Sequence, residues 1–570
     1  MHHMSAAQFV PGVLVVLVVM LAVGGSVAAA EPGGGNDERA RRFIAQYEAT
    51  VRPLEIEVGR CWWAANTSGK DEDYQKKQAA ETRLDLCLSD PKTFAELQAI
   101  KEGGVTDPLL RRQIAVLYLE YLAKQVDPEL LKQMIAKSNA IEQAFNVYRA
   151  KVEGKELSQN EIRQVLRRSP DSAQRRAVWE ASKGVGRVVE ADLKELVKLR
   201  NQAARKLGFK DFHVMELALA EQDQQQVLKL FDELDALTRA PFHAAKAEID
   251  AALAKNCGIK VNQLRPWHYH DPFFQESPEV FGQPSDAVYG KVDVVKVCRE
   301  FYDGIGLPVD DVLGRSDLYE KKGKSPHAFS TDIDRAGDVR VLANIVPNKE
   351  WLSTMLHELG HAVYSSKNVP ASVPYALRTD AHALTTEGVA MMFERFAGNA
   401  DWLLALGVKV PDPKQFNATS AKLRRNQLLI FSRWCQVMFR FEKELYANPD
   451  QDLNRLWWDL VEKYQEVKCP ADRNAPDYAS KIHIVSAPVY YHNYMMGELF
   501  AAQLHQAIAR EVLKGADPAT AVYVGNKAAG DFMKRRVFAP GRTLDWNQLT
   551  RYATGAELKA KAFAVDLKSK

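Results

Sequence analysis

Several features that mark common protein classes are scarce in this sequence. It has only six cysteines in 570 residues, and no two of them form a C-x-x-C pair, which argues against a cysteine zinc cluster or a redox dithiol. Lys and Arg number 76 against 73 Asp and Glu, a net charge of +3. This balance provides no basic surface for a phosphate backbone, so we expect no nucleic-acid partner. After residue 30, no apolar run is long enough to cross a bilayer.

The N-terminal segment is the one long apolar run. Residues 9–30 carry no charge and end in Ala28-Ala29-Ala30, before a glycine-rich stretch. This is typical of a secretory signal peptide, although a segment of that length can also remain as a membrane anchor. We predict a signal peptide or anchor over residues 1–30 and a single mainly helical domain over residues 31–570. The protein is then exported, to the periplasm or the exterior, and we expect at most one or two disulfides.

Most of the remaining chain has the apolar spacing of amphipathic helices. Residues 325–345 differ, because they alternate polar and apolar residues around a turn signal at 334–338 and so predict a β-hairpin. The fold class we expect is mainly α, with one large helical body and a small hairpin. The clearest predicted helices cover residues 37–63, 109–148, 188–207, 224–253, 421–446 and 489–513.

The strongest chemical signal is the run His357-Glu358-Leu359-Gly360-His361. Residues four apart lie on one face of a helix, so the two histidines can bind one Zn²⁺ and Glu358 can reach a water beside it. The apolar flanks place this motif on a buried helix. Two core histidines satisfied by their neighbours are the alternative reading.

A catalytic zinc site needs a third protein ligand and one open position. A further histidine six residues on is excluded, because that position is Lys367. Glu387 stands in an apolar helical segment, where an unpaired carboxylate is costly and metal coordination removes the cost. We predict Glu387 as the third ligand, with Asp380 as the alternative. Glu394 is interpreted as a solvated acid or as a group that supports the site.

Beyond this motif, the sequence resembles the angiotensin-converting-enzyme type of peptidyl-dipeptidase. The resemblance covers most of residues 40–510. A weaker similarity to the thimet oligopeptidase and oligoendopeptidase group appears in the spacing from His483 to Gly497. The matching pieces are residues 43–47, 62–67, 201–205, 327–328, 457–460, 463–465 and 481–484.

The resemblance implies a helical peptidase with two lobes around a deep central channel and one zinc ion per chain. It implies that His357, His361 and Glu387 bind the zinc. It further implies that Glu358 is the general base that activates water and then passes the proton to the leaving amine. The hairpin would lie next to this active site.

The resemblance also assigns residues to the substrate. Lys481 and Tyr490 match the groups that hold the substrate's C-terminal carboxylate, and an ammonium and a phenol are suitable donors for it. His327 and Ala328 match a strand that pairs with the peptide backbone. His483 matches a further catalytic residue of the family. We expect it to stabilise the oxyanion together with Tyr494, which lies four residues after Tyr490 and so on the same helical face.

The sequence departs from the family pattern in several places. Met391 stands where the family has an acid that supports the metal site. The oxyanion tyrosine falls on Asn493 in an ungapped match, with Tyr494 one residue away. The arginine of the family's chloride site falls on His492 or Asn493, which argues against chloride activation. The carboxylate-binding glutamine has no clear counterpart, and the nearest stretch is residues 267–271.

We therefore expect a zinc metallopeptidase that hydrolyses short peptides and releases C-terminal dipeptides. A single-residue carboxypeptidase and an oligoendopeptidase are the alternatives within this class. A catalytically inactive peptide-binding homologue is the alternative outside it, and the complete set of motif residues with Glu387 argues against it. Short peptides are the expected partners, with no membrane contact beyond the N-terminal segment and no obligate protein partner indicated.

Overall fold

A computed structural model describes residues 35–282 and 286–568 of the chain. Helices dominate this part, and its strands form two small antiparallel hairpins, β1 with β2 and β3 with β4. The mainly α fold predicted from the sequence is confirmed. The strands are β1 (Ala150–Val152), β2 (Lys155–Leu157), β3 (Phe329–Asp332) and β4 (Val339–Leu342).

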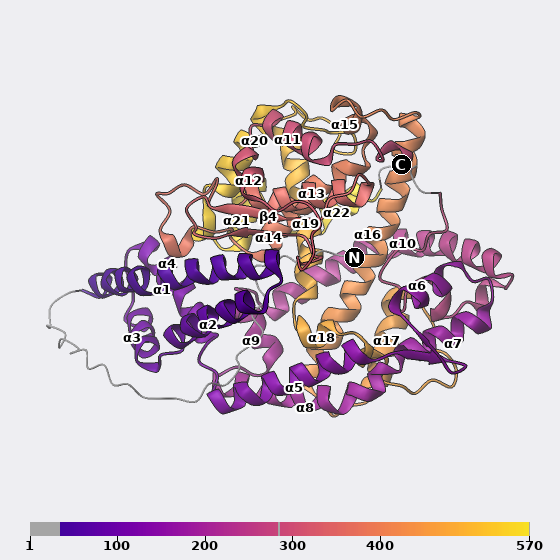
Figure 1. The fold of residues 1–570 in the computed structure, drawn as a ribbon, viewed down its shortest axis with the longest axis horizontal. Coiled ribbons are helices and arrows are strands. Elements are labelled where there is room, and N and C mark those ends of the chain that lie inside the picture. The colour runs from indigo at the N-terminus through magenta and orange to yellow at the C-terminus, as the bar shows by residue number, and fades with distance from the viewer. Residues whose placement is uncertain (1–34, 283–285, 569–570) are drawn as a thin grey trace.

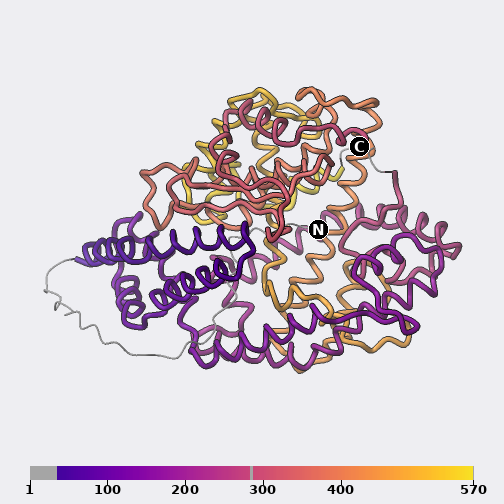
Figure 2. The backbone as a smooth tube through the Cα atoms, viewed as in Figure 1, coloured from indigo at the N-terminus to yellow at the C-terminus, as the bar shows by residue number. Residues whose placement is uncertain are grey.

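The first four helices form a unit around a second hydrophobic core, to which Tyr375 and Ala376 also contribute (Figures 1 and 2). Ile44, Leu97 and Tyr121 are among its buried side chains. Several contacts join the unit to the rest of the chain, among them Arg335, whose guanidinium donates to Glu55 at 2.7 Å, and Arg112, which donates to Glu221 at 3.1 Å. Its helices are α1 (Asn36–Ser68), α2 (Asp71–Leu88), α3 (Pro91–Glu102) and α4 (Pro108–Leu122).

Most of the rest of the described chain shares one much larger core, beside a small third cluster around Val369 and Leu377. This core joins residues from Ile141 to Leu567, so the elements that follow α4 fold together as one body. The helices are α5 (Pro128–Val147), α6 (Gln159–Arg168), α7 (Ser172–Lys183), α8 (Val185–Lys206), α9 (Phe212–Leu219), α10 (Gln224–Cys257), α11 (Val294–Gly304), α12 (Asp310–Arg315), α13 (Lys349–Val363), α14 (Ala383–Glu394), α15 (Ala400–Ala405), α16 (Pro413–Ala447), α17 (Leu453–Gln465), α18 (His483–Ser486), α19 (Tyr491–Glu511), α20 (Lys527–Met533), α21 (Trp546–Thr554) and α22 (Lys561–Asp566).

The body divides into an upper and a lower part in the view of Figure 1. The upper part holds α11 to α15 and α20 to α22, and the lower part holds α5 to α9, α17 and α18. The long helices α16 and α19 run between the two and contact each other. This arrangement agrees with two lobes, and the deep channel between them stays a prediction.

The helix predicted over residues 109–148 is wrong as a single element. The structure ends α4 at Leu122 and begins α5 at Pro128, because Asp127 caps the new helix and its side chain accepts from the N–H of Leu130. Proline at a first helical position favours such a start. The hairpin of β1 and β2 was not predicted, since its strands have only three residues each.

The hairpin predicted over residues 325–345 is confirmed as β3 and β4. Its turn contains two left-handed residues, Arg335 with φ 50° and Gly337 with φ 106°. The carboxylate of Asp332 fastens this turn by accepting from the backbone N–H groups of Arg335 and Ser366. Strand β3 packs against α13, so the hairpin lies beside the helix that carries the histidine motif.

Two glycines let α13, α14 and α19 approach closely. A Cβ at Gly360 of α13 would lie 2.8 Å from the Cα of Ala390 on α14. A Cβ at Gly388 of α14 would lie 2.7 Å from the carbonyl oxygen of Gly497 on α19. Separations under 3.0 Å are not tolerated by a real side chain, so only glycine permits this packing.

All six cysteines lie among the described residues and are unpaired. None of the described helices is both long and apolar enough to span a membrane. The signal peptide or anchor predicted for residues 1–30 lies outside the described residues, and the domain boundary at residue 31 stays a prediction.

Candidate active site

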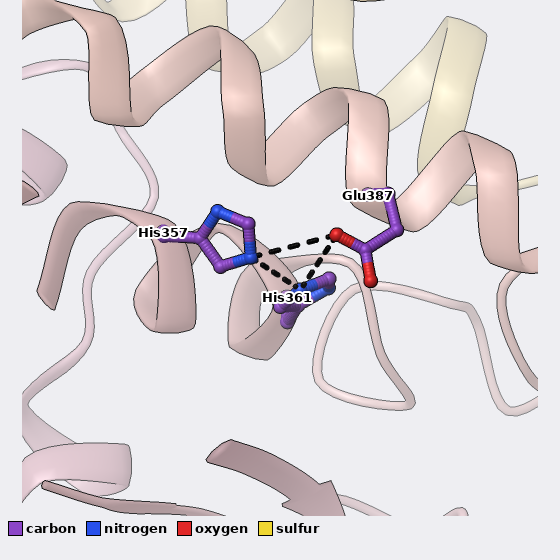
Figure 3. Close-up of side chains that lie close together, drawn as sticks. All are labelled: His357, His361 and Glu387. Atoms are coloured by element: carbon purple, nitrogen blue, oxygen red, sulfur yellow. Dashed lines mark hydrogen bonds and ion pairs between the residues drawn. The ribbon is translucent and has the colours of Figure 1, made fainter. Parts of the chain in front are cut away.

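Helices α13 and α14 bring the three predicted metal ligands together (Figure 3). Asn348 caps α13 by accepting from the N–H of Trp351 at 2.8 Å, so the motif lies inside a regular, buried helix. Helix α14 crosses it and supplies Glu387. One ligand atom from each of His357, His361 and Glu387 lies within 4.8 Å of the others, and all three side chains are buried.

Hydrogen bonds to the outer ring nitrogens fix the direction of both histidines. The Nδ1 of His357 lies 2.6 Å from a carboxylate oxygen of Glu394, and the Nδ1 of His361 lies 2.8 Å from the hydroxyl of Thr386. The two Nε2 atoms therefore face each other, 3.1 Å apart. Glu387 Oε2 lies 3.6 Å from the Nε2 of His357 and 3.9 Å from that of His361. A hydrogen bond to the ring nitrogen that faces away from the metal commonly orients metal-binding histidines.

Glu387 shows that these residues fit a zinc ion. Its side chain is fully buried, and neither carboxylate oxygen accepts a hydrogen bond from a described residue. Burial raises the pKa of Glu387 to about 8. A cation between two inward-facing imidazoles and this carboxylate would remove the cost of burying it. Two histidines and one carboxylate with an open fourth position are a known ligand set of catalytic zinc.

The carboxyl group of Glu358 faces strand β3. The backbone N–H of Ser330 donates to this carboxyl group, whereas Oε2 is buried without a hydrogen-bond partner among the described residues. Burial raises the pKa of Glu358 to about 7. Glu358 thus combines one fixed oxygen with one oxygen that is available to a proton, as a general base requires.

Two tyrosines at the start of α19 lie near Glu387. Burial raises the pKa of the Tyr490 and Tyr494 hydroxyls, and the charge of Glu387 raises both further. Their rings meet edge to face with centroids 5.2 Å apart. Both phenols therefore stay neutral and can donate a hydrogen bond beside the metal ligands.

Lys481 lies in a separate, aromatic setting. Its ammonium group donates to the side-chain oxygen of Gln275 at 2.7 Å. The ring centroids of Phe273, Trp434 and Tyr491 surround it at 5.3, 5.1 and 5.3 Å. Burial lowers the pKa of Lys481 to about 8. Two polar groups in a largely apolar wall can hold one carboxylate.

Comparison with known proteins identifies the family. The model of peptidase family M3 matches residues 165–568, and that of angiotensin-converting enzyme matches residues 35–245. The first match covers most of the chain and every residue of the candidate site. The chain belongs to peptidase family M3. Together with the three-ligand cluster, this membership classes the chain with the zinc metallopeptidases.

Individual relatives of this M3 chain are distant. The angiotensin-converting enzyme-like protein Ace3 of Mus musculus is 23% identical over 443 residues, which are 71% of this chain and 58% of that protein. The angiotensin-converting enzyme of Theromyzon tessulatum is 19% identical over 517 residues, 82% of each chain. That of Rattus norvegicus is 23% identical over 285 residues, 46% of this chain and 20% of its own length. The chain thus spans about three fifths of the first relative and a fifth of the last.

The structure places a tyrosine beside Lys481 that the sequence analysis did not name. This is Tyr491, and the ring of His483 lies 5.3 Å from its ring. Tyr490 lies toward Glu387. The carboxylate role of Tyr490 and the catalytic roles of His483 and Tyr494 stay predictions.

The strand predicted to carry His327 and Ala328 begins two residues later than His327, at Phe329. His327 is exposed and Ala328 is buried, immediately before β3. Their pairing with a peptide backbone stays a prediction.

Four residues of the M3 site were not assigned from the sequence. Glu394 and Thr386 orient the zinc histidines, Gln275 binds Lys481, and Tyr491 adjoins it. Glu394 carried a usable signal, because it lies two helical turns after Glu387 and so on the same face of α14. The sequence gives no such signal for Thr386, Gln275 and Tyr491, since their partners lie on other elements.

Proposed function

We propose that this chain is a zinc-dependent peptidase that releases dipeptides from the C-terminus of short peptides. One observation carries the proposal: the metal-ligand cluster with Glu358 stands on α13 and α14, while a lysine–glutamine pair suited to a carboxylate stands on other segments. A peptide whose C-terminal carboxylate is held by Lys481 and Gln275 would present an internal peptide bond to the metal-ligand cluster.

The proposed chemistry assigns a task to each group. Zinc, when bound to His357, His361 and Glu387, supplies a Lewis acid for the scissile carbonyl and lowers the pKa of water. Glu358 accepts the proton of the attacking water and passes it to the leaving amine. The neutral hydroxyl of Tyr494, assisted by the imidazole of His483, donates to the developing oxyanion. The remaining tasks are substrate contacts. His327 and Ala328 lie along the peptide backbone, and Lys481 and Tyr490 hold the C-terminal carboxylate, where Gln275 and Tyr491 also adjoin Lys481.

We also propose that chloride does not activate the enzyme. The two positions that match the chloride-site arginine are engaged in neutral hydrogen bonds. His492 Nε2 donates to Gln222 Oε1 at 2.6 Å, and the amide of Gln222 donates to Asn493 at 2.8 Å. Burial lowers the pKa of His492, so its imidazole is neutral and offers no positive charge to an anion.

The proposed setting is outside the cytoplasm, in the periplasm or the exterior, as the apolar segment before residue 31 predicts. The proposed substrates are short, unfolded peptides, with no nucleic acid and no obligate protein partner. Residues 31–570 act as one peptidase domain in this proposal.

Internal cleavage is the second candidate. It is favoured by the position of the catalytic residues, which all fall in the match to family M3 and outside the match to angiotensin-converting enzyme. The deciding experiment is mass spectrometry of products from a decapeptide and its C-terminal amide, with and without a zinc chelator. Chelator-sensitive dipeptides from the free acid, formed much more slowly from the amide, support the proposal. Equal internal cuts in both peptides favour the second candidate, and single released residues indicate a carboxypeptidase.

A further inference from the structure

The segment from Lys481 to Tyr494 carries most of the substrate-side residues but has little regular structure of its own. His483 begins α18, which has only four residues, and an isolated helix of that length is not stable. Residues 487–490 then form a joint to α19. The position of this segment therefore has to be fixed by neighbouring elements.

Arg200 of α8 holds the end of α18. Its Nη1 donates to the carbonyl oxygen of Ile484 at 3.0 Å, and its Nη2 donates to that of Val485 at 2.7 Å. Carbonyl groups at a helix end have no partner within the helix, so the guanidinium supplies the missing donors. Nη1 also donates to the hydroxyl of Tyr446 on α16 at 3.0 Å. The side chain is buried.

Glu442 of α16 holds the joint. The N–H of Val489 donates to Glu442 Oε1 at 2.8 Å, and only 1% of Glu442 is exposed. Val489 has φ 54°, in the left-handed region. A β-branched residue is rarely found there, and such a conformation persists only where its surroundings hold it. The buried Oε1 of Glu442 stabilises this conformation of Val489 by accepting from its N–H.

The joint decides which way the following tyrosines face. Immediately after Val489, Tyr490 lies toward Glu387, and Tyr491 lies against the ammonium group of Lys481. Tyr494 follows one helical turn after Tyr490 and also lies toward Glu387. A rotation of the backbone at Val489 would move all three phenols together.

We propose that Glu442 and Arg200 are positioning residues, which hold α18 and the left-handed joint so that His483, Tyr491 and Tyr494 face the peptide. This proposal rests on the function proposed above. Burial raises the pKa of Glu442 to about 8. A neutral side chain that keeps the acceptor oxygen should therefore serve as well as the native one.

The test compares Glu442→Leu with Glu442→Gln in the full zinc-loaded chain. Leucine removes the acceptor and glutamine keeps it. We expect Glu442→Leu to lower kcat on a free-acid peptide at least about tenfold, because small displacements of catalytic groups are costly, with zinc content unchanged. Glu442→Gln should stay within about twofold of the native chain. If the leucine variant does not fold, Glu442→Asp shortens the reach by one methylene and should show a several-fold loss.

Glu216 of α9 is the matched control. It is a half-buried glutamate on a neighbouring helix; burial raises its pKa to about 7, and nearby Arg200 lowers it. Among the described residues, no hydrogen bond joins it to residues 481–494. Glu216→Leu should lower the melting temperature without a matching loss of kcat. Equal kcat losses in the two leucine variants, or a glutamine variant as impaired as the leucine one, would overturn the positioning role. A native chain that releases no dipeptide would instead overturn the proposed function, and this role with it.

Discussion

Glu358 is the residue whose replacement should separate chemistry from metal binding. Glu358→Gln removes the proton acceptor but leaves His357, His361 and Glu387 in place, so we expect kcat to fall at least about a hundredfold. Zinc content, measured by atomic emission on the purified variant, should stay at one ion per chain. A variant with full zinc and near-normal turnover would remove Glu358 from the role of base.

Lys481 predicts a pH dependence that depends on the substrate's C-terminus. Burial lowers the pKa of Lys481 to about 8, so the ammonium group is charged below that pH and neutral above it. The charged form attracts a carboxylate, and kcat/KM reports groups of the free enzyme. We expect kcat/KM for free-acid peptides to fall as pH rises through about 8.

C-terminal amides are the control for that profile. Because they carry no terminal charge, their kcat/KM should not fall with the titration of Lys481. The two profiles are measured side by side at saturating zinc. Superimposable profiles would argue that Lys481 does not hold the carboxylate.

For single residues, a role could be predicted from the sequence only where it depends on local spacing. The separation of His357 and His361 and the apolar surroundings of Glu387 are visible in the sequence, and the structure brings these three together. Glu394 was left between two interpretations, because its contact with His357 depends on how α14 crosses α13. The contact of Tyr491 with Lys481 was not predicted, because it follows the left-handed residue Val489, whose conformation no local pattern shows, and the carboxylate role of Tyr490 stays a prediction.

The packing of α13 on α14 predicts a sensitivity at Gly360. A methyl group there would lie 2.8 Å from the Cα of Ala390, so Gly360→Ala has to push the two helices apart. Overpacking of this kind costs about 1–3 kcal/mol. Since the zinc ligands are divided between these helices, we also expect faster loss of zinc to a chelator. Thermal unfolding and zinc retention are the two measurements.

Gly314 provides a matched control for that substitution. It lies on α12 with nothing within 4 Å of the place where its Cβ would be. Gly314→Ala should stabilise the protein by about 0.5–1 kcal/mol or leave it unchanged, because alanine is the better helix former. Equal destabilisation by both substitutions would contradict the close-approach argument.

Among whole elements, the hairpin with a clear turn signal between two alternating runs was predictable. Alternation around residues 334–338 located β3 and β4. The break between α4 and α5 was missed although Asp127-Pro128 is a helix-start signal, because the apolar spacing on either side reads as continuous. Strands as short as those of β1 and β2 have too few residues for alternation to stand out.

For the whole molecule, removal of zinc should lower stability. A ligand that binds only the native state stabilises it by about 2.7 kcal/mol at a hundredfold excess over its Kd. For a chain of this length we expect a chelator to lower Tm by at least about 2 °C. Differential scanning calorimetry checks this, and added zinc should restore Tm. In His361→Ala, one of the three ligands is missing, and Tm should respond much less to the chelator.

The separate core of α1 to α4 and the substrate-side site were beyond the reach of sequence periodicity. Apolar spacing shows that a helix has a buried face, but it does not show which other helix covers that face. The contact of Lys481 with Gln275 joins residues 206 positions apart, so no local sequence pattern predicts it.

This difference in sequence separation has a consequence for the order of folding. The contacts that orient the two histidines join residues only 25 and 37 positions apart, whereas the proposed carboxylate site joins Lys481 to Gln275 from the other half of the chain. Closing short loops costs less entropy and is faster than closing long ones. During refolding with zinc present, we expect metal uptake to precede peptide hydrolysis, which stopped-flow measurements of a zinc indicator and of product release can resolve. A newly made chain would then bind its metal before it could bind a peptide. It would therefore hydrolyse no peptide until folding is complete.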